Sequence, residues 1–191
     1  MGAKTRIIDD ETYEKIVKTL REGFVHDGVV IAPKEQIAMA LILERNLGLR
    51  ISDILNLTMD SFIKDGEQYR LDIVEKKTGK HRGFVCPNEV YQLIIEYAYD
   101  RGINPKARLF PFTDRYVQKY LKLVCEYLGL DHVGTHSFRK AFAMSAYQKS
   151  GYSVVMVKEL LQHSDLRSTQ CYIGADSKEV EKVLQGVVNI V

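Results

Sequence analysis

The chain has 191 residues, 46% of them hydrophobic, and a formal net charge of +2 at pH 7. This length and composition predict one domain with a real hydrophobic core. The nearly neutral charge does not by itself indicate nucleic-acid binding, so such a function must rest on where the charges lie.

Cysteines occur at Cys86, Cys125 and Cys171. Their odd number and wide spacing argue against a disulfide framework and favour a reducing compartment. The sequence has no C-x-x-C pair and therefore does not indicate a metal site. The N-terminus leads into polar residues, and we see neither a signal peptide nor a membrane span. We therefore expect a cytoplasmic protein without membrane contact.

The first third of the chain predicts two helices and a sharp break. Acidic residues at 9–11 precede apolar residues at helical spacing, which indicates a helix that ends before His26. A second helix, with Pro33 at its start and Gly48 at its end, has very few polar residues along its apolar run. Such a helix is typical of the buried centre of a domain.

Arg50 follows Gly48 and lies among apolar residues, beside a short helix that Ser52 or Asp53 can cap. A partly buried arginine needs a partner. Asp53, three residues on, is one candidate, and in that case Arg50 only fixes the turn. The alternative is a functional role for Arg50.

A β-hairpin is predicted after this short helix. Residues 69–75 and 82–86 alternate in polarity as strands do, and residues 62–63 can supply a third short strand. The hairpin tip carries Lys76, Lys77, Lys80 and Arg82. Such a cluster is usually a solvated turn, but it can also enter a DNA groove or reach a phosphate.

Two further helices are predicted at 88–102, with Asn88 as cap, and at about 114–128. The second of them carries Arg115, Lys119 and Lys122 on its outer side. Six basic residues and one acid lie between 101 and 122, so the modest net charge hides a positive surface. A DNA backbone is one partner for this surface, and a merely solvated face is the other interpretation.

Residues 137–149 contain neither Pro nor Gly, and Phe138 and Ala141 begin the apolar stripe of a helix. His136 and Arg139 fall near each other, roughly a third of a circle from that stripe. The first turn of a helix favours an anion. The pair is therefore a plausible phosphate site, or else a surface arginine and a histidine satisfied by a backbone carbonyl.

The remaining chain predicts a short helix from Val154 to His163, followed by Tyr172. Asp176 and Glu179 form a capping-box pattern, which indicates a tail helix at 176–190. Its apolar side can pack in its own protomer or in a neighbouring one.

Taken together, these motifs resemble the catalytic domain of the tyrosine recombinase (phage integrase) family. They run in the family's order: Arg50, Lys77, His136, Arg139, His163 and Tyr172. The resemblance implies an α+β fold, mainly helical, with helices packed around a small antiparallel β-sheet or hairpin. Residues 1–191 would then be the catalytic domain, without the DNA-binding modules that usually precede it.

The resemblance also implies an enzyme, a site-specific recombinase that integrates or excises a mobile element through a 3′-phosphotyrosyl intermediate. Tyr172 would be the nucleophile and His136 its base. Arg50 and Arg139 would clamp the phosphate. The implied roles of the remaining residues are proton donation to the 5′ oxygen by Lys77, with Lys76 and Lys80 as competitors, and a hydrogen bond from His163. No metal and no cofactor are expected.

The expected partner is double-stranded DNA, bound as a homotetramer by a protein that is monomeric in isolation. DNA contacts are expected from Lys76, Lys80, Arg82, Arg115 and Lys119. One alternative is a type IB topoisomerase-like enzyme that relaxes supercoils. The other is a DNA-binding regulator without activity, which an altered catalytic residue would indicate; none is evident.

Overall fold

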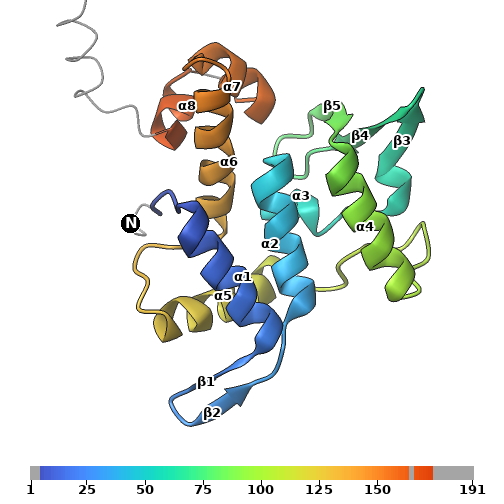
Figure 1. The fold of residues 1–191 in the computed structure, drawn as a ribbon. Helices are drawn as coiled ribbons and strands as arrows, with labels where there is room; N and C mark the ends of the chain where they lie inside the picture. The colour runs from blue at the N-terminus through green and yellow to red at the C-terminus, as the bar shows by residue number, and fades with distance from the viewer. Residues whose placement is uncertain (1–4, 164–165, 174–191) are drawn as a thin grey trace, which may run out of the picture. The chain divides into compact units, whose positions relative to one another are not determined.

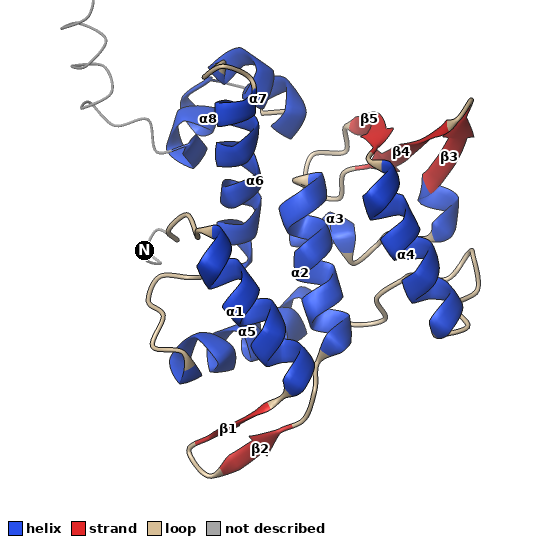
Figure 2. Cartoon of the chain, viewed as in Figure 1, coloured by secondary structure: helices blue, strands red, loops and turns tan. Residues whose placement is uncertain are grey.

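A computed structural model of the chain describes residues 5–163 and 166–173. The chain divides into two units, Met1–Phe142 and Ala143–Val191. Figure 1 follows the elements along the chain, and Figure 2 separates helices from strands. No helix in the described part has the length and hydropathy that a membrane span needs.

Helix α1 (Asp10–Glu22) confirms the first predicted helix. It begins where the side chain of Asp9 accepts a hydrogen bond from the Thr12 amide at 2.7 Å. Such a cap satisfies one of the backbone N–H groups that a helix start leaves open. The helix buries Ile16 and Leu20 and packs against α2 and α5.

Helix α2 (Glu35–Leu47) is the buried centre of the first unit, as predicted. Its residues from Ile37 to Glu44 are all buried, and each fully buried Leu or Ile contributes about 1.5–3 kcal/mol. Helix α3 (Ile51–Ile54) follows, with Arg50 at the N-cap position and no side-chain cap. The predicted cap by Ser52 or Asp53 is therefore wrong.

A two-stranded hairpin, β1 (Phe24–His26) and β2 (Val29–Ile31), was not predicted. It lies between α1 and α2 in the chain (Figure 1). Asp27 and Gly28 form its turn, both with positive φ, 49° and 74°. An Asp-Gly pair between β-branched runs is a strong hairpin signal, so the sequence did hold the information.

The predicted hairpin and third strand are confirmed as one antiparallel sheet. Its strands are β3 (Phe62–Asp65), after the short helix η1 (Met59–Ser61), then β4 (Gln68–Val74) and β5 (His81–Cys86), in the order β3-β4-β5. Leu71 in β4 is fully buried and pairs with Phe62 and Phe84. Helix α4 packs on β4, where the rings of Tyr69 and Tyr91 stack 3.6 Å apart.

Helices α4 (Asn88–Asp100), α5 (Asp114–Tyr127) and α6 (Thr135–Lys149) lie close to their predicted ranges. Asn88 does not cap α4, because Pro87 occupies the N-cap position without a side-chain hydrogen bond. In α6, Phe138 and Ala141 are buried as the apolar stripe predicts. His136 lies in the first turn, as expected.

In the second unit, α7 (Val154–Leu161) is capped by Ser153, which accepts a hydrogen bond from the Met156 amide at 3.2 Å. Helix α8 (Leu166–Ile173), which was not predicted, packs against α7. The predicted tail helix at 176–190 lies outside the described residues. Helices and two small antiparallel sheets make up the described elements, which confirms the mainly helical α+β class.

Gly48 lies where the end of α2 packs against Phe142 of α6. It ends α2 in the left-handed region, with φ 59°, where residues other than glycine are strained. A Cβ at this position would lie 2.3 Å from Cδ1 of Phe142. Gly66, in the turn between β3 and β4, has nearly the same φ, 64°, but no atom within 4 Å of such a Cβ.

We expect Gly66→Ala to lower the free energy of unfolding by about 1–2 kcal/mol, from backbone strain alone. Gly48→Ala should cost about 1–3 kcal/mol more, because Phe142 must move. Urea unfolding of the two variants measures the difference. Equal losses would contradict a close contact between Gly48 and Phe142.

Candidate active site

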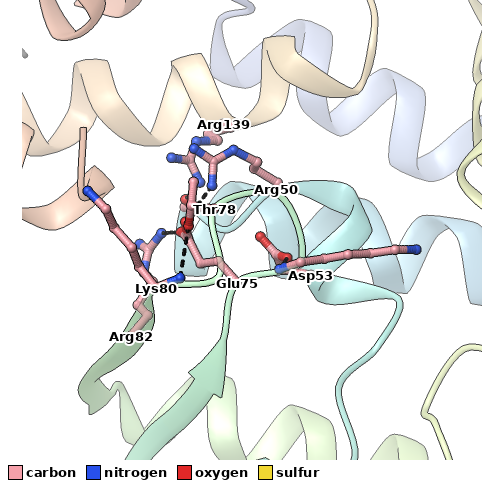
Figure 3. Close-up of polar contacts among 9 residues, drawn as sticks. Arg50, Asp53, Glu75, Thr78, Lys80, Arg82 and Arg139 are labelled. Carbon is pink, nitrogen blue, oxygen red and sulfur yellow. Dashed lines mark hydrogen bonds and ion pairs between the residues drawn. The ribbon is translucent and has the colours of Figure 1, made fainter. Parts of the chain in front are cut away.

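Arg50 is held by Glu75 rather than by Asp53. Its Nη1 donates to Oε2 of Glu75 at 2.6 Å, and the Glu75 side chain is fully buried. Arg82 Nη1 donates to the other oxygen, Oε1, at 3.1 Å. The hydroxyl of Thr78 donates to Oε2 at 2.8 Å. Figure 3 shows these side chains meeting at the hairpin turn.

Glu75 is ionised in this setting. Burial by itself would raise the pKa of Glu75, but hydrogen bonds from Thr78, Arg50 and Arg82 outweigh it and leave the pKa below its ordinary value. Hydrogen bonds to a carboxylate favour its charged form. Glu75 therefore stays negative at neutral pH and keeps both guanidinium groups in place.

Asp53, the expected partner of Arg50, supports the hairpin instead. Its Oδ1 accepts a hydrogen bond from the Lys76 amide at 2.9 Å. Burial raises the pKa of Asp53, while the Lys76 amide, Arg50 and Arg139 oppose that rise. Asp53 thus ties α3 to the hairpin tip and still interacts electrostatically with both arginines.

Arg139 is buried, although helical spacing predicted that it would face a ligand. Its side chain is 0% exposed, and Nη1 donates to the carbonyl of Gly48 at 2.6 Å. That carbonyl follows the C-terminus of α2, where a cation is favoured. Burial raises the pKa of the neighbouring Glu44 well above its ordinary value, and Arg139 opposes the rise.

His136 is the point on which the predicted cations converge. Burial lowers the pKa of its imidazole, and Arg139, Lys77, Arg50 and Lys140 lower it further. The residue as a whole remains exposed at the surface, so only part of its ring is desolvated. Coulombic effects between exposed groups fade within about 8 Å in physiological salt. Residues far apart in the sequence therefore share one site.

The hairpin lysines face solvent. Lys76, Lys77 and Lys80 are all exposed, and Lys77 is the one that acts on the pKa of His136. Arg82 differs from our expectation of a DNA contact. It is 1% exposed, pairs with Glu75 and lies over the ring of Phe84. In this structure Arg82 supports the hairpin from inside.

The basic side of α5 is exposed as predicted. Arg115 and Lys119 both face solvent, and the Lys119 ammonium lies 5.6 Å from the ring centre of Tyr120. Their expected contact with DNA stays a prediction, because no partner is present.

His163 and Tyr172 belong to the second unit. Nδ1 of His163 lies 3.0 Å from the hydroxyl of Thr169 in α8. Tyr172 is a residue of α8, and its side chain lies outside the described part. The structure thus brings together Arg50, Lys77, His136 and Arg139 within the first unit, while the catalytic roles of all six residues stay predictions.

Sequence reasoning missed Glu75, Thr78 and Glu44. In the sequence pattern Glu75 is the polar end of a strand, and Thr78 is part of a turn. The signal for Glu44 is a lone acid directly after the apolar run 37–43. A buried carboxylate needs a cationic partner, so that acid could have pointed to a buried arginine such as Arg139.

Comparison with known proteins identifies the family. The model of the phage integrase family matches residues 6–179. The probable integrase/recombinase YoeC of Bacillus subtilis is 32% identical over 139 residues, covering 69% of this chain and 73% of YoeC. Tyrosine recombinase XerC of Bradyrhizobium diazoefficiens is 32% identical over 162 residues, covering 80% of this chain and 49% of XerC. The chain thus spans about half the length of XerC.

Solved structures agree on the fold. The XerH site-specific recombinase bound to palindromic difH substrate has a TM-score of 0.69 at 22% identity, covering 95% of this chain and 53% of XerH. The catalytic domain of bacteriophage HP1 integrase has a TM-score of 0.62 at 16% identity, with 95% of each chain covered. Since the family model spans most of the sequence, the chain belongs to the phage integrase family, as a tyrosine recombinase catalytic domain.

Proposed function

We propose that this protein is the catalytic part of a site-specific DNA recombinase that cleaves and rejoins strands through a 3′-phosphotyrosyl intermediate. The observation that carries the proposal is the convergence of Arg50, Lys77 and Arg139 on His136. A phosphodiester carries one negative charge, and its cleavage places more charge on the non-bridging oxygens. Positive groups held in place before the substrate arrives stabilise that charge without reorganisation.

In this mechanism Arg50 and Arg139 bind the phosphate through their guanidinium groups. Planar guanidinium groups suit phosphate oxygens because they donate two parallel hydrogen bonds. By comparison with oxyanion donors in other enzymes, each should contribute about 3 kcal/mol to lowering the barrier.

Tyr172 is the proposed nucleophile. A tyrosine with its reference pKa near 10 is ionised to about one part in a thousand at neutral pH. It therefore needs a base, and His136, whose pKa is lowered, is neutral and can accept the proton. The proton moves from the Tyr172 hydroxyl to His136 as the oxygen attacks phosphorus, and the 5′ oxygen departs.

The departing 5′ oxygen needs a proton, and Lys77 is the proposed donor. Lys77 is exposed at the hairpin tip and still acts on His136. The phosphotyrosyl bond that replaces the DNA ester keeps the energy for rejoining, so the scheme needs neither a metal nor ATP. His163 is proposed to hydrogen-bond the same phosphate.

The proposed substrate is double-stranded DNA, contacted by Lys76, Lys80, Arg115 and Lys119 around the cleaved phosphate and paired in a homotetramer. The names of similar proteins, among them a probable integrase/recombinase and a tyrosine recombinase, support DNA recombination, and the proposed outcome is integration or excision of a mobile element. A topoisomerase-like enzyme would relax supercoiled DNA without pairing sites. Assays for supercoil relaxation and for two-site exchange separate these outcomes.

Tyr172→Phe should abolish a covalent protein–DNA adduct while leaving DNA affinity within about twofold, because only the attacking oxygen is lost. The substrate is a pool of nicked duplexes with randomised sequence, in which the cleaved end diffuses away and traps the adduct. Denaturing gels detect the adduct, and sequencing of the trapped strands supplies a defined substrate. An adduct that survives in Tyr172→Phe would assign the nucleophile elsewhere.

Lys77→Ala should slow single-turnover cleavage by about 10²–10⁴-fold, the usual contribution of a general acid. Lys76→Ala and Lys80→Ala serve as matched controls and should affect cleavage less than about tenfold. A substrate with a 5′-bridging sulfur, which leaves without a proton, should restore cleavage by Lys77→Ala alone. If Lys80→Ala shows the larger loss and the restoration, the assignment moves to Lys80.

The pH profile of cleavage tests His136 as base. Its pKa lies below the ordinary value of 6.5, so His136 stays neutral at pH 7 and gains a proton only at lower pH. At low DNA concentration the rate should therefore be flat near pH 7 and fall below pH 6.5. At saturating DNA this limb should move to higher pH, because the phosphate offsets the surrounding cations. His136→Ala should cleave slowly, and its rate should not fall below pH 6.5. If the rate of this variant falls as in the unchanged protein, His136 is not the base.

A further inference from the structure

Glu75 lies where Arg50, which follows α2, meets the hairpin turn. Its Oε2 accepts hydrogen bonds from both Arg50, at 2.6 Å, and Thr78, at 2.8 Å. Arg50 comes from the break after α2, whereas Thr78 follows Lys77 directly in the turn. The two partners therefore share one acceptor oxygen (Figure 3).

The backbone of Glu75 also closes the turn that carries Lys77. Its amide donates to the carbonyl of Lys80 at 2.9 Å, and its carbonyl accepts from the Gly79 amide at 2.8 Å. The side chain of Arg82, from β5, anchors the other carboxylate oxygen. Lys77 thus projects from a turn whose two ends are fixed by one residue.

We propose that Glu75 is a positioning residue that sets Arg50 and the Lys77 turn relative to each other. This inference rests on the proposed function, in which Arg50 binds the phosphate and Lys77 protonates the leaving oxygen. Both groups must meet one phosphate, and an error of about 1 Å in such a geometry can cost a hundredfold in rate. A single buried carboxylate that holds both keeps that error small.

Glutamine in place of Glu75 is the informative substitution. Its amide has nearly the same shape but only one accepting oxygen, and its NH₂ group would face a guanidinium donor. One arginine would then lose its acceptor and the turn would shift. Glu75→Asp keeps the charge, and Glu67→Gln, at the exposed turn between β3 and β4, removes one acid elsewhere on the same sheet.

The first experiment measures single-turnover adduct formation on oxygen and 5′-bridging sulfur substrates. Glu75→Gln should cleave the oxygen substrate about 10–100-fold more slowly than the unchanged protein. The sulfur substrate should remove part of that loss, because a misplaced Lys77 no longer matters. Glu75→Gln combined with Lys77→Ala should lose less than the product of the two single losses. Glu75→Asp should recover part of the rate, and Glu67→Gln should match the unchanged protein.

A purely structural role would give a different result. Equal losses by Glu75→Gln on both substrates, or independent losses in the double variant, would overturn the proposal. If Glu75→Gln does not fold, Thr78→Val replaces it, since that change removes one hydrogen bond of the turn and leaves the Arg50 contact. Thr78→Val should lose less cleavage rate than Glu75→Gln, and the sulfur substrate should again remove part of the loss. If the sulfur substrate does not do so, the proposal is also overturned.

The second experiment needs no DNA. In Arg50→Met, hydrogen exchange of the Gly79 amide should be faster by about threefold or more than in the unchanged protein, because the turn loses one of its anchors. Glu67→Gln should leave that rate unchanged. If exchange is faster in Arg50→Met but the unchanged protein cuts no DNA, the coupling is supported and the proposed function is refuted. Unchanged exchange would overturn the coupling, whatever the protein does with DNA.

Discussion

The buried carboxylate of Glu75 is the constraint on which the first unit's site depends. Removing a carboxylate from water costs several kcal/mol unless close partners compensate it. Those partners come from three places: Arg50 after α2, Thr78 in the turn and Arg82 in β5. The buried carboxylate thus links the end of α2, the hairpin turn and β5.

Arg139 obeys a second constraint of the same kind. It is buried in α6 and reaches the carbonyl of Gly48, where α2 ends. Only a residue without a side chain fits at Gly48, because Phe142 fills the space that a Cβ would need. The glycine thus provides both the break that presents Arg50 and the carbonyl that holds Arg139. Two arginines far apart in sequence are positioned by the same turn.

Periodicity predicted the elements that bury apolar stripes, such as α2 and α6, because their sequence pattern is local. It could not identify the partner of Arg50, since Asp53 is close in sequence while Glu75 is brought near only by the hairpin. The burial of Arg82 was within reach, because strand alternation places Arg82 on the face of the buried Cys86. Its charge, rather than its register, led us to expect solvent. Ion pairs between segments far apart in the chain cannot be predicted from local sequence patterns.

Several cations act on His136 although the net charge of the chain is only +2. Glu75 is ionised and offsets only one of its two arginine partners. Burial raises the pKa of Glu44 well above its ordinary value, and Arg139 opposes that rise. Burial also lowers the pKa of His136, and Arg139, Lys77 and Arg50 lower it further. In the proposed mechanism, the cations that would attract a phosphodiester also keep His136 neutral, so that it can accept a proton; affinity and reactivity would then have one electrostatic origin.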